Sequence, residues 1–215
     1  MFRTASILLA AAAMSGCERG PWTLGHITDE KAADLNREVT TRGLIVSLEG
    51  MQPFSWHYAD DMAALVAGNV GLAHSATSGN YQAHLPFIEQ AHRNSQPVFI
   101  VGYSIGGDQA RLLAVLCKEK GIPIRVLFLI DPGYLAAAPG KVPDNVEKAI
   151  FYTGRDYDVF VNKPPGKEHL EDPKRTAFVG EDFPFTCHAD MPMHVAEKVE
   201  AEVRAAMQRP ATRPR

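Results

Sequence analysis

The sequence predicts an α/β fold of three layers, in which a mostly parallel central sheet is covered by helices on both faces. Short runs of aliphatic residues alternate along the chain with stretches of helical periodicity. These runs are apolar at successive positions, as parallel strands buried on both faces are. Apolar residues make up 46% of the 215 positions, which is enough for one core. We expect strands over 44–48, 70–74, 98–102, 124–130 and 149–153, and helices over 58–67, 83–93, 105–120 and 192–207.

The first 17 residues have the pattern of a secretion signal. Arg3 precedes an apolar run over 7–14, which is far shorter than the roughly 20 residues that a membrane-spanning helix needs. Residues 14–17, Met-Ser-Gly-Cys, resemble the bacterial lipobox, a motif whose cysteine is acylated and becomes the new N-terminus. The resemblance implies an exported lipoprotein that is anchored through Cys17 and faces the periplasm, and Glu18 resembles the sorting residue of outer-membrane lipoproteins. The alternative is an ordinary cleaved signal peptide with an incidental cysteine.

One domain is expected beyond this leader. Residues 18–40 have the mixed character of a tether, the α/β pattern covers 41–208, and 209–215 form a flexible, proline-interrupted tail. The stretch 155–187 is rich in proline, glycine and charged residues and is too long for a simple connection, so we expect a flap or cap over one end of the sheet. The formal net charge is −3 and the only basic cluster lies in the tail, which argues against a nucleic-acid partner.

A Gly-x-Ser-x-Gly motif lies over 102–106, between a predicted strand and a predicted helix. A serine at such a strand-to-helix turn has a strained backbone, and the flanking glycines leave room for the strand and the helix to approach each other. The helix N-terminus also directs free N–H groups at the serine, where the oxyanion of an acyl-transfer intermediate forms. In this motif and its surroundings, over about 44–207, the sequence resembles the α/β-hydrolase superfamily, with Ser104 as the nucleophile.

The resemblance implies an acid and then a histidine after the nucleophile in chain order. Asp131 ends the apolar strand that follows the nucleophile's helix, and this segment resembles the acid-bearing strand of thioesterase domains. Asp156 is the alternative acid, in a Gly-Arg-Asp turn one strand later, where most other members of the superfamily have it. His188 lies in a loop directly before the last helix, as the superfamily's base does, whereas His194 would lie inside that helix with less freedom to reach the nucleophile. We therefore expect a triad of Ser104, Asp131 and His188.

Members of the superfamily take one oxyanion donor from the residue after the nucleophile and a second from the loop after the first inner strand. These positions are the backbone N–H groups of Ile105 and Met51. The sequence departs from the superfamily in this loop, because Glu49-Gly50 replaces the usual His-Gly. The implied reaction is the cleavage of a small carboxylic ester or acyl thioester through an acyl-enzyme, with no cofactor and no metal. An acyltransferase with the same triad fits the sequence as well.

Two other classes of protein remain open from the residues alone. The segment 187–194 holds Cys187, His188, Met191, Met193 and His194, and thiolate, thioether and imidazole groups all suit Cu(I). This pattern indicates a copper-binding periplasmic lipoprotein as a rival, although the methionines also fit the packing of the last helix. The other alternative is a catalytically inactive binding protein on the same fold.

Overall fold

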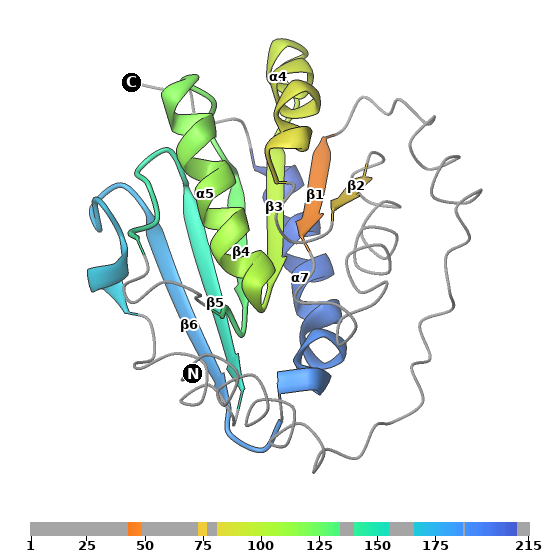
Figure 1. Cartoon of the computed structure of the whole chain (residues 1–215), viewed down its shortest axis with the longest axis vertical. Coiled ribbons are helices and arrows are strands. Elements are labelled where there is room, and N and C mark those ends of the chain that lie inside the picture. Colours follow the sequence, from red (N-terminus) through yellow and green to blue (C-terminus); the bar gives the residue numbers. More distant parts are fainter. Residues whose placement is uncertain are drawn as a thin grey trace, which may run out of the picture.

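The central sheet has six strands in the computed structural model, which describes residues 43–48, 73–76, 81–133, 140–154, 166–186 and 188–209. The strands are β1 (Leu44–Leu48), β2 (Ala73–Ala76), β3 (Val98–Tyr103), β4 (Val126–Ile130), β5 (Lys148–Gly154) and β6 (Ala177–Phe183). Their order is β2-β1-β3-β4-β5-β6, and every neighbouring pair is parallel (Figure 1). Parallel pairing throughout brings the carboxyl ends of all the strands to the same edge of the sheet.

Helices cover both faces of this sheet, and the prediction of a three-layer α/β fold is confirmed. α4 (Leu85–Arg93), preceded by the 3-10 turn η1 (Tyr81–His84), and α5 (Ile105–Glu119) pack on one face. α7 (Met191–Gln208) packs on the other face (Figure 1). Two further 3-10 turns, η2 (Lys167–His169) and η3 (His188–Asp190), precede β6 and α7 respectively. Within the described ranges, no helix is both long and apolar enough to cross a bilayer.

Alternate residues of the central strands fill two separate cores, one on each face of the sheet. In β3, Val98 and Ile100 pack beneath α4 and α5, while Phe99, Val101 and Tyr103 pack beneath α7. This alternation follows from the pleat of a strand, in which successive side chains point to opposite faces. It puts the ring of the last residue of β3 on the α7 face, at the carboxyl edge of the sheet.

The predicted elements agree with the structure where it describes them. β1 has the predicted bounds, β3 extends one residue beyond its prediction, and β5 extends one residue at each end. β4 starts at Val126, because Ile124 forms only an isolated bridge to Val146. α4, α5 and α7 lie within two residues of the bounds expected for them. β2 spans Ala73–Ala76, where a strand was expected over 70–74, and both 70–72 and the helix expected over 58–67 lie outside the described residues.

The prediction of a flap or cap over 155–187 is wrong for part of this range, because 177–183 form the strand β6. This strand pairs with β5 along its whole length, and it is an edge of the sheet. Its side chains are exposed or half-buried, so the segment has no continuous apolar run by which a buried parallel strand is recognised. Positions 155–165 and 187 of this range, the tether over 18–40 and the end of the tail lie outside the described residues.

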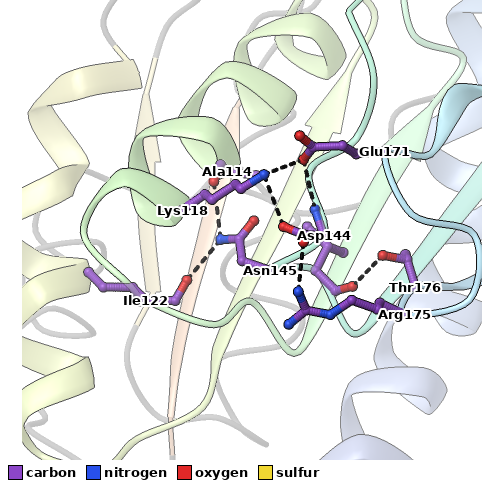
Figure 2. Close-up of polar contacts among 9 residues, drawn as sticks. Ala114, Lys118, Ile122, Asp144, Asn145, Glu171, Arg175 and Thr176 are labelled. Carbon is purple, nitrogen blue, oxygen red and sulfur yellow. Dashed lines mark hydrogen bonds and ion pairs between the residues drawn. The ribbon is translucent and has the colours of Figure 1, made fainter. Parts of the chain in front are cut away.

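A polar network joins the end of α5 to the segment before β5, at the edge of the sheet opposite the carboxyl ends (Figure 2). Nδ2 of Asn145 donates hydrogen bonds to the carbonyl oxygens of Ala114, at 3.2 Å, and Ile122, at 2.8 Å. Nζ of Lys118 pairs with a carboxylate oxygen of Asp144 at 3.0 Å. The amide holds the C-terminal end of α5 against the sheet, and the ion pair is a more exposed contact beside it.

Replacement of Asn145 by aspartate is expected to lower the free energy of unfolding by about 2–4 kcal/mol, because a carboxylate would face two carbonyl oxygens that now receive N–H groups. Asn145→Ala should cost about 1–2 kcal/mol, since it removes both hydrogen bonds without adding a charge. Urea denaturation followed by circular dichroism measures both changes. Asp144→Asn is the control and should matter much less, because surface ion pairs are screened by solvent. Equal stability of Asn145→Asp and the wild type would show that the amide does not hold α5.

Candidate active site

Three of the predicted site residues lie at the carboxyl edge of the sheet. Ser104 directly follows β3, Asp131 directly follows β4, and His188 begins the turn η3 beyond β6. Gly154, the last residue of β5, joins them through its backbone N–H. Residues as far as 84 positions apart in the chain therefore lie at the same edge of the sheet, because parallel strands end there.

Ser104 has the strained backbone that a strand-to-helix turn imposes. Its φ is 54° and its ψ is −127°, and it is the N-cap of α5. Its N–H donates to the carbonyl oxygen of Ile130 at 3.0 Å, and its own carbonyl oxygen accepts from the N–H groups of Gly107, at 2.9 Å, and Gly133, at 2.8 Å. These hydrogen bonds hold the serine in a conformation that non-glycine residues rarely adopt.

The glycines around this turn allow the strand, the helix and the next loop to touch. A Cβ at Gly102 would lie 2.4 Å from the carbonyl oxygen of Gly106 and 2.6 Å from Cβ of Ala110. A Cβ at Gly107 would lie 2.6 Å from Cβ of Pro132, in the loop after β4. These three distances are too short for a side chain at either position. The steric role expected for the glycine before the serine therefore holds at Gly102, and Gly107, which is not part of the motif, has a similar role.

Asp131 and His188 form a buried, directly hydrogen-bonded pair. Oδ2 of the aspartate lies 2.5 Å from Nδ1 of the imidazole, and the two side chains are 1% and 5% exposed. The other carboxylate oxygen accepts the backbone N–H of Gly154 at 2.9 Å, and the Asp131 N–H donates to the Tyr152 carbonyl oxygen at 2.7 Å. The carboxylate is therefore fixed from two sides and directed at Nδ1, and Nε2 is the ring nitrogen that the aspartate does not contact.

Tyr103 is a further contact of the histidine, and the sequence analysis did not find it. Its hydroxyl donates to the backbone carbonyl oxygen of His188 at 2.9 Å, and the two rings are stacked with centroids 5.0 Å apart. Burial, with the nearby carboxylates of Asp131 and Asp190, raises the pKa of Tyr103 above its usual value, so the phenol remains a proton donor. The alternation along β3 assigns Tyr103 to the α7 face, but its partner lies 85 residues away.

Of the other predicted site residues, Ile105 begins α5 directly after Ser104, whereas His194 and Met191 are not part of the cluster. The side chain of His194 is exposed on α7. Met191 is fully buried, and a Cβ on Gly154 would lie 2.9 Å from its Cγ, so this methionine packs in the core. Within the described ranges, no group of three His, Cys, Asp or Glu side chains is placed to share a metal ion. The expected oxyanion residue Met51, the alternative acid Asp156, the lipidation residue Cys17, Cys187 and the side chain of Met193 lie outside the described residues.

The sequence matches no protein-family model and no curated protein. Solved structures resemble the fold at low sequence identity. A structure described as an arylesterase has a TM-score of 0.53 and 10% identity, over 79% of this chain and 78% of that chain. EstE5, from a crystal soaked with p-nitrophenyl butyrate, has a TM-score of 0.58 and 12% identity, over 94% and 98% of the two chains. A hormone-sensitive lipase from a metagenome library has a TM-score of 0.53 and 11% identity, over 96% and 98%.

Likeness at these identities concerns the fold, and it agrees with the sheet and helices described above. The chain has the α/β-hydrolase fold, and the resemblance on which the sequence analysis rested is confirmed at that level. Because one fold supports many activities, function has to be argued from the residues at the carboxyl edge of the sheet.

Proposed function

We propose that this protein is a serine hydrolase that cleaves a carboxylic ester or an acyl thioester through an acyl-enzyme intermediate. The observation that carries the proposal is the 2.5 Å pairing of Asp131 with His188, at the sheet edge that also carries the strained Ser104. An acid that orients a histidine beside a serine on a helix N-terminus is the arrangement used for acyl transfer on several unrelated folds. An inactive binding protein would have no use for such a pair.

The proposed reaction has two halves. In the first, Oγ of Ser104 attacks the carbonyl carbon while Nε2 of His188 takes the hydroxyl proton, and the N–H of Ile105 stabilises the oxyanion. The intermediate collapses, and the leaving alcohol or thiol takes the proton from the imidazolium. In the second half, His188 takes a proton from water, the resulting nucleophile attacks the acyl carbon, and the acid is released with Ser104 restored. Asp131 keeps Nδ1 protonated and stabilises the imidazolium throughout. The Met51 N–H remains the expected second oxyanion donor.

The substrate class rests on less specific observations. Several proteins with the same fold are named as esterases or a lipase, and the crystal of one was soaked with p-nitrophenyl butyrate. The acid of the proposed triad follows β4, the strand directly after the nucleophile's helix, as in the thioesterase domains that the sequence resembles. Short p-nitrophenyl esters and acyl thioesters are therefore the substrates to compare first.

Labelling with a fluorophosphonate tests the proposed function directly, since the reagent phosphonylates serines that are activated by a neighbouring base. We expect one adduct per chain, located by mass spectrometry on the peptide that contains Ser104. Preincubation with a slowly hydrolysed ester should protect against the adduct. An adduct on another residue, or none in a protein that hydrolyses esters, would contradict the assignment of Ser104.

Tyr103→Phe tests the contact with the histidine backbone. We expect kcat/KM for an ester to fall by roughly three- to tenfold, because the phenylalanine ring keeps the stacking but no longer donates to the carbonyl oxygen of His188. Tyr152→Phe is a matched control, since this buried tyrosine lies on β5 in the same core and its ring contacts Phe183. A loss of activity in Tyr152→Phe as large as in Tyr103→Phe would assign the effect to packing.

We also propose that Cys17 anchors the protein to a membrane, on the basis of the lipobox at 14–17 alone. Cys17→Ser should move the protein from the membrane fraction to the soluble fraction. The substitution removes the cysteine that would carry the acyl chains, and two or more such chains are needed for stable attachment. Fractionation before and after a salt wash, followed by immunoblotting, measures the distribution. A Cys17→Ser protein that stays membrane-bound after the wash would reject the lipid anchor.

A further inference from the structure

Gly133 lies against the proposed nucleophile, two residues after the proposed acid. Its N–H donates to the carbonyl oxygen of Ser104 at 2.8 Å. A Cβ added at Gly133 would lie 3.6 Å from Oγ of Ser104 and 3.5 Å from the backbone nitrogen of Ile105. These atoms are the nucleophile and an oxyanion donor of the proposed function. Position 133 therefore borders the place where the reacting carbonyl group has to lie.

Packing against the described part of the chain does not account for this glycine. A Cβ at Gly102 would lie 2.4 Å from the carbonyl oxygen of Gly106, and a Cβ at Gly154 would lie 2.9 Å from Met191, so packing excludes side chains there. At Gly133, the nearest atoms of the described residues would be 3.5 Å away, an ordinary van der Waals distance, and φ lies outside the left-handed region. Alanine would fit the backbone and the space that these residues leave, and it would reduce the conformational entropy of the unfolded chain. The absence of a side chain calls for another explanation.

Gly133 and His188 lie on opposite sides of the nucleophile. Pro132 contacts Gly107 of α5, which puts the loop that carries Gly133 on the α5 side of the sheet edge. His188 stacks on Tyr103, whose ring belongs to the core beneath α7, on the opposite side. A leaving group has to depart towards the imidazole that protonates it. The acyl part of the substrate is then left on the side of Gly133.

We infer that the space at Gly133 receives the acyl group of the substrate, and that the missing side chain determines how bulky the acyl α-carbon can be. This inference rests on the proposed function. The attacked carbon has to approach Oγ to about 3 Å, and its oxygen has to approach the Ile105 N–H to a similar distance. A methyl group at position 133, within 3.6 Å of both protein atoms, would meet the substituents on that carbon. Gly133 is thus a specificity-determining position. It admits acyl groups that are branched at the α-carbon, whereas an alanine at this position would exclude them.

The test is a comparison of Gly133→Ala with the full-length wild type on p-nitrophenyl acetate and p-nitrophenyl 2-methylpropanoate, which share a leaving group. We expect kcat/KM to fall less than about fivefold for the acetate and by roughly 10- to 200-fold for the branched ester, since a methyl group in a tight pocket discriminates to this extent. The ratio of the two values cancels differences in the fraction of active protein. Thermal unfolding should show a midpoint equal to or above that of the wild type.

Gly180→Ala is the matched control, because it makes the same change at an exposed position of β6 and should leave the ratio unchanged. An equal loss on both esters in Gly133→Ala would mean that the glycine supports the turn and would overturn the inference, as would unchanged activity on both. A change that follows the alcohol of acetate esters rather than the acyl group would also overturn it. A wild type that cleaves no ester and forms no fluorophosphonate adduct would reject the proposed function itself, and the inference with it.

Discussion

Ser104→Ala is expected to lower kcat/KM for p-nitrophenyl butyrate by about 10⁵- to 10⁶-fold, because it removes the only atom that forms the acyl-enzyme bond. The fold should be unaffected. The hydrogen bonds that hold the strained turn use the backbone N–H and carbonyl oxygen of Ser104, and none of them uses Oγ. Alanine has the same difficulty with a φ of 54° as serine does, so the strain is unchanged. Turnover is measured by p-nitrophenol release and folding by thermal unfolding.

Ser95→Ala is the matched control for this change. Ser95 also has a positive φ, of 58°, but it lies between α4 and β3, at the end of the strand opposite the proposed site. Its replacement should leave kcat/KM and fluorophosphonate labelling at wild-type levels. Undiminished turnover or labelling in Ser104→Ala would reject the serine-hydrolase proposal.

Asp131→Asn is expected to lower turnover by up to about 10⁴-fold, as the equivalent change does in serine proteases, because the histidine is held in the wrong tautomer. The amide oxygen of an asparagine can still accept the Gly154 N–H, which now bonds to Oδ1. Its NH₂ group would then face Nδ1 of His188, where Oδ2 now lies at 2.5 Å. Nδ1 would have to accept a hydrogen bond, so the ring proton moves to Nε2 and the imidazole loses its capacity to take the proton of Ser104.

Asp156→Asn distinguishes the two acids that the sequence offers. If Asp131 is the acid, this change should cost little, and the loss of activity in Asp131→Asn should come mostly from kcat. Far-ultraviolet circular dichroism and thermal unfolding of both variants separate a loss of chemistry from a loss of folding. The reverse ranking of the two variants would move the acid to Asp156 and leave the class of enzyme unchanged.

Much of the sheet could be predicted from the sequence, because the central strands are buried on both faces and consist of continuous apolar runs. β1, β3, β4 and β5 are of this kind. β6 is not, since it is an edge strand with exposed and half-buried side chains, and its segment was expected to be a flap. Its place in the sheet follows from backbone hydrogen bonding with β5. Such bonding does not require apolar side chains, so the sequence of β6 has no apolar pattern that would identify it as a strand.

The same division applies to the candidate site. Ser104 and Gly102 could be found from the sequence, because the strand-to-helix turn imposes its steric demands on residues within a few positions of each other. Asp131 and His188 could be nominated from their chain order, but Asp156 and His194 met similar criteria. The ranking of the two aspartates depended on resemblance to a superfamily, whereas His188 was also preferred because a histidine inside a helix has less freedom to reach the nucleophile.

The three-layer architecture and the position of the turn at Ser104 could be predicted from the residues alone, because both follow from short-range patterns of apolar and glycine residues. The contact between Asp131 and His188 is visible only in three dimensions, since the two residues lie 57 positions apart and are joined by the order of β4, β5 and β6. The same holds for the contact of Tyr103 with His188 and for the position of Gly133 beside Ser104. Such contacts depend on how strand ends and loops are placed relative to one another in three dimensions, which residue spacing along the chain does not encode.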